Sequence, residues 1–290
     1  MRIWLRGALA ATAALGLVAA GLGATGVAAQ ATPLSYVALG DSYTAAPLVP
    51  PLAARAPLDC LQSASNYPHL TARALGLSLV DRSCTSADTA DMTTAQYLDQ
   101  PPQFKALQPT TAVVTIGIGG NDNDLFVGAL TSCGALDAAD FLNIGSPCQA
   151  VFGNHFAQEI TADGPALKAA FVAIHTRSPL ARVLVIGYPD ILPQHGNCYP
   201  LIPLTTADTA YLNSVEMTLN AELSTEAAAA GATYVDTFSG SLGHDACKAE
   251  GVRWIEPIIP GTLAFPVHPN ANGEAHDATV VEAAIGAAGL

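Results

Sequence analysis

Basic residues are scarce in this sequence. Only 11 of the 290 residues are lysine or arginine, against 24 aspartates and glutamates, so the formal net charge at pH 7 is −13. An acidic surface of this kind repels nucleic acid and anionic headgroups. We therefore expect no nucleic-acid partner. Half of the residues are hydrophobic, which is enough for a sizeable core and makes disorder a poor description of the chain.

Long hydrophobic runs are also missing once residues 1–31 are set aside. That segment has two early arginines, an uncharged Ala/Leu/Gly run and small residues at its end. This pattern predicts a signal peptide cleaved after Ala29 or Ala31, with a retained membrane anchor as the alternative. No later stretch approaches the roughly 20 apolar residues needed to cross a bilayer. We expect residues 32–290 to form one exported domain with no stable membrane span, because no internal repeat or low-complexity linker interrupts them.

Several catalytic and ligand-binding motifs are absent. The sequence contains no Cys-x-x-Cys, Ser-x-x-Lys or His-Glu-x-x-His, which disfavours a zinc site, a lactamase and a zinc protease. The stretch GIGGND at residues 117–122 has neither a dinucleotide-binding nor a Walker spacing, and no lysine follows it. The serine in GDSYT, residues 40–44, does not lie in a Gly-x-Ser-x-Gly elbow.

The cysteine count is even. Six cysteines follow the predicted signal peptide, and an even number in an exported chain indicates three disulfides rather than a catalytic thiol. The sequence alone allows 15 pairings. The cysteines fall as successive pairs that bracket loop-like stretches, which favours Cys60–Cys84, Cys133–Cys148 and Cys198–Cys247.

Short apolar runs alternate with helix-like segments along the chain. The runs are continuous, as in strands buried on both faces, and alternation of this kind indicates a parallel sheet between two helical layers. Gly76 and Gly231 stand where helix C-caps are expected. We predict strands at 35–40, 77–83, 111–119, 181–189 and 232–238, and helices at 66–76, 149–178, 205–231 and 271–289.

Polar residues cluster where the predicted strands end. In open α/β sheets, ligands bind at the carboxyl ends of the strands, and Ser42 and Asn121 each follow a predicted strand. A serine hydroxyl is a potential nucleophile, and an amide N–H is a suitable donor to an oxyanion. Among seven histidines, His268 stands apart because Pro266 and Pro269 flank it on a loop before the last helix. That placement suits a positioned base.

With GDSYT, GGND at 119–122 and VHP at 267–269 in this order, the chain resembles the SGNH/GDSL esterase and lipase family, and most closely its secreted actinobacterial branch. The resemblance extends to SCTSADT at 83–89, IGYPDILP at 186–193 and FPVHPNANGEAH at 265–276, and it covers most of the mature chain. Three successive disulfides also fit this branch. The resemblance implies a flavodoxin-like, three-layer α/β/α fold around a mostly parallel five-stranded sheet.

The family resemblance also implies roles for individual residues. Ser42 would be the nucleophile and His268 the base, and the backbone amides of Ser42 and Ser86 with the side chain of Asn121 would form the oxyanion hole. Ser86 departs from the family's usual glycine. Phe265 stands where the family usually carries an aspartate, so we expect a Ser-His dyad in which a backbone carbonyl near Phe265 accepts the Nδ1 proton; Asp236 or Asp245 is the alternative partner.

The sequence therefore predicts a secreted, monomeric hydrolase of carboxylic or lipid esters that acts through an acyl-serine intermediate. The resemblance implies neither a metal nor another cofactor. Activity is expected to fall as the pH drops through the pKa of the histidine, near 6.5 if unperturbed. The alternatives are a phospholipase or lysophospholipase, a glycan acetyl esterase, and a secreted binding protein that has the fold without turnover.

Overall fold

Five parallel strands form the centre of the molecule. The computed structural model describes residues 32–138, 140 and 142–289, and the predicted signal peptide lies outside the described residues. The strand order is β2-β1-β3-β4-β5, and each neighbouring pair runs in parallel. The strands are β1 (Ser35–Gly40), β2 (Ser78–Asp81), β3 (Val113–Gly117), β4 (Arg182–Ile186) and β5 (Thr233–Val235).

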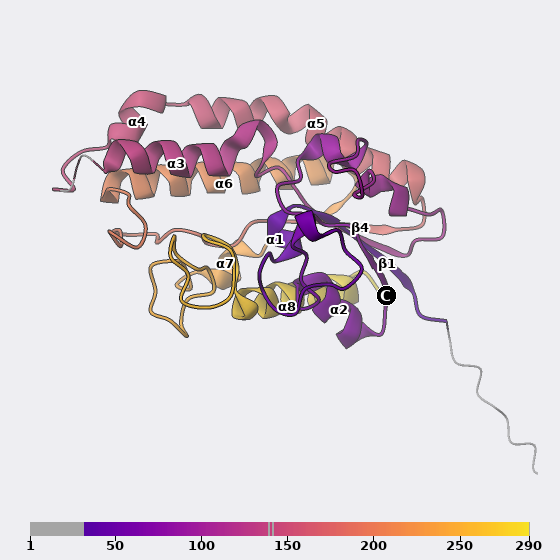
Figure 1. Cartoon of the computed structure of the whole chain (residues 1–290). Helices are drawn as coiled ribbons and strands as arrows, with labels where there is room; N and C mark the ends of the chain where they lie inside the picture. Colours follow the sequence, from indigo (N-terminus) through magenta and orange to yellow (C-terminus); the bar gives the residue numbers. More distant parts are fainter. Residues whose placement is uncertain (1–31, 139, 141, 290) are drawn as a thin grey trace, which may run out of the picture. The chain divides into compact units, whose positions relative to one another are not determined.

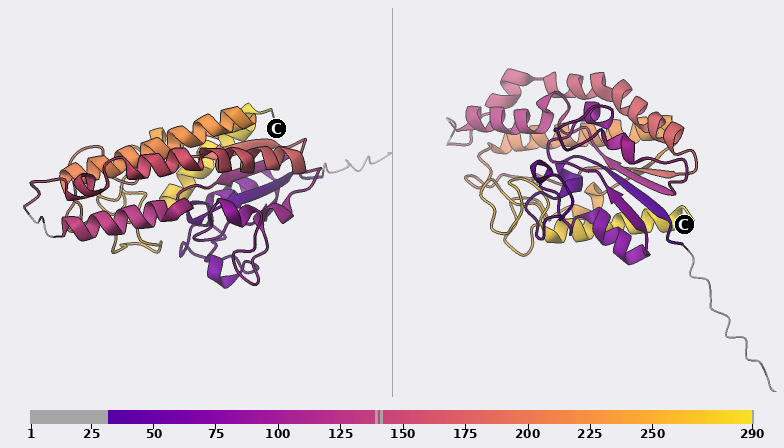
Figure 2. Two further views of the ribbon diagram at one scale, coloured as in Figure 1. Left: turned by 90° about the horizontal axis from the view of Figure 1, so that it is seen from above. Right: turned by 45° about the vertical axis from the view of Figure 1, so that its right-hand side comes forward.

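Helices cover both faces of the sheet, so the fold is the predicted three-layer α/β/α sandwich (Figure 1). On one face lie α2 (Tyr67–Leu75) and α8 (Ala271–Ala287). On the other face lie α5 (His155–Arg177) and α6 (Thr206–Ala230), with α3 (Leu125–Asp137) and α4 (Pro147–Phe152) packed against them. Figure 2 shows the same two layers from two further directions. Shorter helices are α1 (Ser42–Ala45) and α7 (Phe238–Ser241), and 3₁₀ turns occur at Leu58–Cys60, Thr89–Met92, Gln103–Ala106 and Asp122–Asp124.

The central strands supply side chains to two hydrophobic clusters. In β1, Tyr36 and Ala38 pack toward α2 and α8, whereas Val37 and Leu39 pack toward the α5 and α6 side. Successive side chains of a strand point to opposite faces, so a strand between two helical layers is apolar throughout. The continuous runs in the sequence have this physical cause.

The predicted helices are largely present, with one division. Gly76 and Gly231 end α2 and α6 in the left-handed region, at φ 64° and 76°, as the C-cap prediction required. The segment expected as one helix at 149–178 is instead α4 followed by α5. The break falls at Gly153, whose φ of 51° is incompatible with a continuing right-handed helix.

The sequence prediction missed helix α3. Its apolar residues occupy all faces of the helix, since Leu125 is buried while Val127 is 59% exposed, so no 3.6-residue periodicity marks it. Cys133 therefore lies within a helix and its disulfide to Cys148 joins α3 to α4; only part of the stretch between them is loop. The other two disulfides link Cys60 to Cys84 and Cys198 to Cys247, so all three follow the successive pairing favoured by the sequence.

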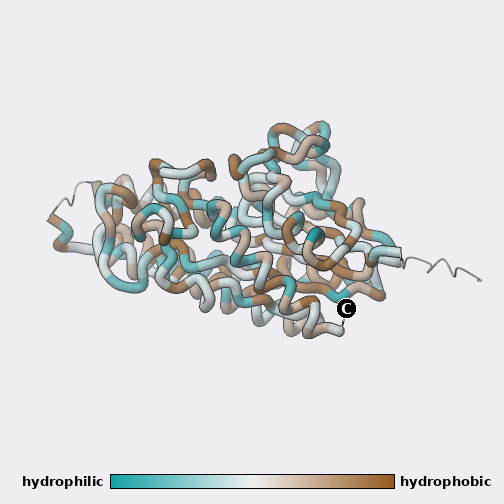
Figure 3. The backbone as a smooth tube through the Cα atoms, turned by 90° about the horizontal axis from the view of Figure 1, so that it is seen from below, coloured by the Kyte–Doolittle hydropathy of each residue, from teal (hydrophilic) through white to brown (hydrophobic). Residues whose placement is uncertain are grey.

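Hydrophobic stretches along the backbone are short. In Figure 3 they alternate with hydrophilic stretches along the helices that cover the sheet. Among the described residues, no helix has the combination of length and apolar character that crossing a bilayer requires.

Candidate active site

The carboxyl ends of four neighbouring strands converge on one region. Ser42 follows β1, Ser86 follows β2, Asn121 follows β3 and Tyr188 follows β4. Ser42, Ser86, Asn121 and His268 all line a single cavity of about 290 Å³. The structure thus brings together every residue for which the sequence predicted a catalytic role.

The turn that carries Ser42 is tightly constrained. We call residues 40–45 the serine turn. Gly40 has φ 150°, and a Cβ there would lie 2.3 Å from the Thr44 hydroxyl oxygen and 2.5 Å from the carbonyl oxygen of Gly117, so no larger residue fits. The side chain of Gln103 hydrogen-bonds both backbone groups of Gly40, at 2.8 and 2.9 Å. Ser42 then begins α1, with Asp41 as its N-cap.

Ser42 and His268 are in direct contact. The Oγ of Ser42 lies 2.7 Å from the Nε2 of His268, across 226 residues of sequence. The other ring nitrogen, Nδ1, lies 2.8 Å from the carbonyl oxygen of Pro266. That carbonyl requires the proton on Nδ1, which leaves Nε2 as the acceptor for the Ser42 hydroxyl proton. This tautomer is the one a general base needs.

Among the residues that the structure describes, no carboxylate takes the place of the Pro266 carbonyl. Asp236 accepts hydrogen bonds from Phe238 and Ser239, and Asp245 accepts from Cys247 and pairs with Lys248. Burial therefore dominates the electrostatics of His268: it lowers the pKa to about 4, while the bond to Pro266 acts in the opposite direction. This value is well below the 6.5 expected from sequence.

The serine turn also contacts the backbone beside His268. The hydroxyl of Tyr43 donates to the carbonyl of Val267 at 2.7 Å, and the Tyr43 ring lies 4.7 Å from the His268 ring, centroid to centroid. Val267 has φ 60°, which is rare for a β-branched residue. Backbone strain of this kind persists where the surroundings over-determine the conformation, as at active sites.

Three N–H groups are available to a developing negative charge. Among the described residues, neither the Ser42 nor the Ser86 amide donates a hydrogen bond. Asn121 uses one side-chain N–H on the Ala87 carbonyl at 2.9 Å, which fixes the amide and leaves its second hydrogen for a ligand. Ser86 adopts φ 64°, in the left-handed region where glycine is favoured, so serine keeps the backbone donor at some cost in strain.

A buried network holds Asp41 beneath the serine turn. One oxygen of Asp41 accepts from the Tyr43 amide at 2.9 Å, and the other accepts from the Tyr188 hydroxyl. Tyr188 in turn accepts from the amide of Gly120 at 2.8 Å, next to Asn121. Burial raises the pKa of Asp41 to about 7 against the lowering effect of these hydrogen bonds. The network ties the nucleophile's turn to the glycine turn that carries Asn121.

A second carboxyl holds the other side of the site. We call residues 253–270 the histidine loop. The Glu256 backbone pairs with both Val267 and His268, at 2.9 and 3.0 Å. The Glu256 side chain accepts hydrogen bonds from Arg253, Asn270 and Thr262. Burial alone raises the pKa of Glu256, but these bonds outweigh it and lower the pKa to about 2.

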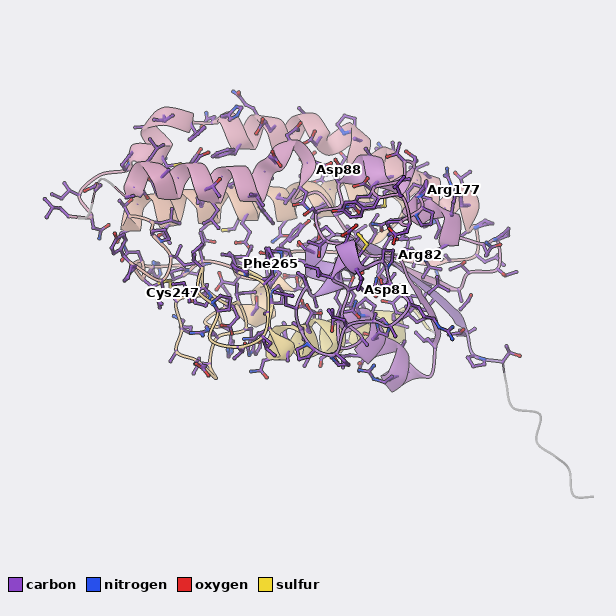
Figure 4. All side chains as sticks on the ribbon, in the orientation of Figure 1. Asp81, Arg82, Asp88, Arg177, Cys247 and Phe265 are labelled. Atoms are coloured by element: carbon purple, nitrogen blue, oxygen red, sulfur yellow. A yellow bond between two sulfur atoms is a disulfide. The ribbon has the colours of Figure 1, made fainter. Side chains whose placement is uncertain are left out.

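The wall of the cavity is predominantly apolar. Helices α3 and α6 form one side of it and the end of the histidine loop forms another. Phe265, labelled in Figure 4, lies beside the serine turn at the edge of this space and is 38% exposed. The apolar lining comprises Phe126, Val127, Ala129, Leu130, Ile191, Leu192, Leu212, Val215, Ile258, Phe265 and Val267. Such a surface suits a hydrocarbon chain.

Sequence reasoning missed the residues that support the site. Gln103, Tyr188 and Glu256 act through hydrogen bonds to segments far from them in the chain, and no local motif marks them. Tyr188 alone had a signal, because it follows a predicted strand within IGYPDILP.

The match to a family model supports the interpretation of this cavity as an active site. The model described as the GDSL-like lipase/acylhydrolase family matches residues 38–276, which includes the serine turn and the histidine loop.

Curated relatives and solved structures agree with that match. Lipase 2 of Streptomyces coelicolor is 46% identical over 272 residues, covering 91% of this chain and 92% of its own length. An extracellular lipase from Streptomyces rimosus superimposes with a TM-score of 0.73 at 28% identity, covering 87% of this chain and 99% of that one. Phospholipase A1 from Streptomyces albidoflavus gives a TM-score of 0.72 at 26% identity with the same coverage.

Proposed function

Because the chain belongs to the GDSL-like lipase/acylhydrolase family and is a carboxylic-ester hydrolase, we propose that it cleaves esters through an acyl-serine intermediate on Ser42. The observation that carries this proposal is the 2.7 Å contact between Ser42 Oγ and His268 Nε2 in the lining of an apolar cavity. A binding protein without turnover has no need of that contact.

The first half of the reaction follows from this geometry. His268 Nε2 takes the Ser42 proton as Oγ attacks the ester carbonyl carbon, and the carbonyl oxygen becomes an oxyanion facing the Ser42 and Ser86 amides and the Asn121 side chain. The bond to the alcohol then breaks, and Nε2 returns its proton to the departing alkoxide oxygen. The acyl group remains on Ser42.

Deacylation repeats these steps with water as the nucleophile. Nε2 takes a proton from the water, whose oxygen attacks the acyl carbon, and Ser42 leaves with that proton. The Pro266 carbonyl holds the imidazole in the productive tautomer throughout. A neutral carbonyl stabilises the imidazolium less than an aspartate does. The bond to Pro266 therefore does not offset the effect of burial, and the pKa of His268 stays low.

The cavity favours a lipid-like acyl group. Its apolar walls fit a hydrocarbon chain better than the acetyl group of a glycan, and a phospholipase is among the similar structures. We propose acyl esters, including those of lipids, as the substrate class. Profiling kcat/KM over p-nitrophenyl esters of increasing chain length, over phospholipids and over acetylated sugars tests this proposal.

We further propose that the protein is exported after cleavage behind Ala29 or Ala31, and that it works as a monomer whose single domain spans residues 32–290. The N-terminal sequence and three disulfides support export. Mass spectrometry of the protein from culture supernatant gives the mature N-terminus, and light scattering gives the oligomeric state.

Replacement of the nucleophile tests the mechanism. Ser42→Ala is expected to lower turnover of a p-nitrophenyl ester by about 10⁴-fold or more, and Asn121→Ala by about 10²–10³-fold. A fluorophosphonate should label the wild type and not Ser42→Ala. The matched control, Ser239→Ala, lies outside the cavity and should behave as wild type. A folded Ser42→Ala protein with undiminished turnover refutes the proposal.

A further inference from the structure

One wall of the cavity carries a carboxyl group among apolar side chains. Leu212, Val215 and Glu216 line the cavity from α6, at the spacing that places residues on one face of a helix. Glu216 is only 3% exposed. A carboxyl in the middle of an apolar stripe costs folding free energy unless it is fully hydrogen-bonded.

Glu216 is not fully hydrogen-bonded. Its Oε2 accepts only a long bond of 3.4 Å from the Ile191 amide, and its Oε1 has no partner among the described residues. Asp41 lines the same cavity, yet both of its oxygens are occupied. Glu256 also uses both oxygens. Glu216 therefore differs from the two carboxyls that hold the site together.

The surroundings of Glu216 favour its neutral form. Burial is the main cause that raises its pKa well above the ordinary value, and the nearby Asp190 adds to it. A neutral carboxyl has an O–H donor as well as an acceptor oxygen. Because the unpaired Oε1 is itself fully buried, a ligand reaches it when the carboxyl turns about its Cγ–Cδ bond toward the cavity that Glu216 lines. A hydrogen bond to an uncharged oxygen there would then satisfy the unpaired atom.

Resting on the proposed function, we propose that Glu216 is a specificity residue that binds an oxygen substituent, a keto or hydroxyl group, carried on the acyl chain of the substrate. The ester carbonyl lies at Ser42 while the chain extends along α6, so the bound oxygen belongs partway along the chain. A wholly apolar chain fills the same cavity but leaves the Glu216 carboxyl unpaired. The enzyme then discriminates between acyl chains of equal length.

A scan of substrate position and two variants test this proposal. The probes are p-nitrophenyl esters of decanoic acid and of keto-decanoic acids that carry the keto group at successive carbons. One or two positions are expected to raise kcat/KM about 3- to 10-fold over decanoate, the gain from one neutral hydrogen bond. Glu216→Met keeps the side-chain length without polar atoms and should abolish the preference. Glu216→Gln keeps an N–H donor and should retain a preference at the same carbon.

A control and a binding measurement separate the possible failures. Glu222→Met makes the same chemical change on α6 outside the cavity and should preserve the wild-type preference. Calorimetry with Ser42→Ala measures affinity for the methyl esters of the same acids without turnover, so loss of the proposed mechanism leaves this comparison intact. The inference is overturned if neither the wild type, measured by kcat/KM, nor Ser42→Ala, measured by affinity, prefers any keto position. It is also overturned if Glu216→Met keeps the preference.

Discussion

The serine turn and the histidine loop are both anchored by a buried carboxyl, but the two carboxyls have opposite electrostatics. Asp41 is bound by neutral donors, the Tyr43 amide and the Tyr188 hydroxyl, and burial raises its pKa to about 7. Glu256 is bound by the Arg253 guanidinium among other donors, and its pKa falls to about 2. A cationic partner thus keeps one anchor charged at every ordinary pH, whereas the other titrates.

The two carboxyls differ in charge because the segments that they hold differ in how much other support they have. The histidine loop contains no helix or regular strand among the described residues, so a permanently charged network suits it. The serine turn continues directly from β1 and is already held by the two hydrogen bonds of Gln103 to Gly40. A neutral or weakly charged carboxyl is sufficient there, and it places less negative charge beside the developing oxyanion.

The largest effect is expected from breaking the charged anchor. Glu256→Gln leaves the Arg253 guanidinium buried without its counter-charge, since the Arg253 side chain is 8% exposed, and should lower the free energy of unfolding by about 3–5 kcal/mol. Urea unfolding measures the change. Asp59→Asn, which alters an exposed carboxylate, should shift the free energy by less than about 0.5 kcal/mol. Equal effects of the two variants would show that Glu256 does not anchor the histidine loop.

The fall of kcat/KM at acid pH tests the protonation of His268, which both anchored regions contact. His268 must be neutral to act as base, so its lowered pKa moves the acid limb of kcat/KM from near 6.5 to about 4. At pH 5 the activity should be about 30-fold higher than a histidine of ordinary pKa allows. Assay by pH-stat, with re-assay at neutral pH after each incubation, separates titration from unfolding. An inflection near 6.5 would show that the imidazole is better hydrated than its surroundings indicate.

Removing the titratable anchor should cost less, and its cost should depend on pH. Asp41→Asn keeps one acceptor oxygen for the Tyr43 amide and places an NH2 group, which cannot accept, against the Tyr188 hydroxyl, at a cost of about 1–3 kcal/mol. Because the folded pKa of Asp41 is raised, its stabilising effect is complete at acid pH and is lost as the pH rises through about 7. Urea unfolding at pH 5 and pH 9 should therefore show a smaller loss at pH 9.

Tyr188→Phe removes the hydrogen bond between Tyr188 and Asp41 from its donor side. The double variant with Asp41→Asn should be less destabilised than the sum of the two single variants, because both remove one shared hydrogen bond. Strict additivity would mean that Tyr188 and Asp41 stabilise the turn independently.

The residues of the site differ in whether the sequence alone could identify them. Ser42, Asn121 and His268 lie in short motifs that follow strands or precede a helix, so their meeting at one edge of a parallel sheet was predictable. Glu256 and Tyr188 are single residues whose partners lie in other segments, and only the folded geometry identifies them. Helix α3 escaped prediction for a related reason: its outer apolar residues belong to a cavity and a surface that the sequence does not reveal.

The smallest effect concerns Tyr43, which joins the two regions from α1 beside the contact of Ser42 with His268. Tyr43→Phe removes the hydrogen bond to the Val267 carbonyl but keeps the ring against His268, so stability should fall by about 0.5–1.5 kcal/mol. The loop beside His268 is strained at Val267, and losing its tether should lower kcat several-fold while KM stays nearly constant.

Tyr211→Phe is the matched control for this last change. Tyr211 also donates to a backbone carbonyl, that of Gly153 at 2.9 Å, but it lies outside the cavity wall. The two variants should lose similar free energies of unfolding, and only Tyr43→Phe should lose kcat. If both leave kcat unchanged, then the two anchored regions are each rigid enough to hold Ser42 and His268 in contact without the tyrosine between them, and the anchors alone account for the geometry of the site.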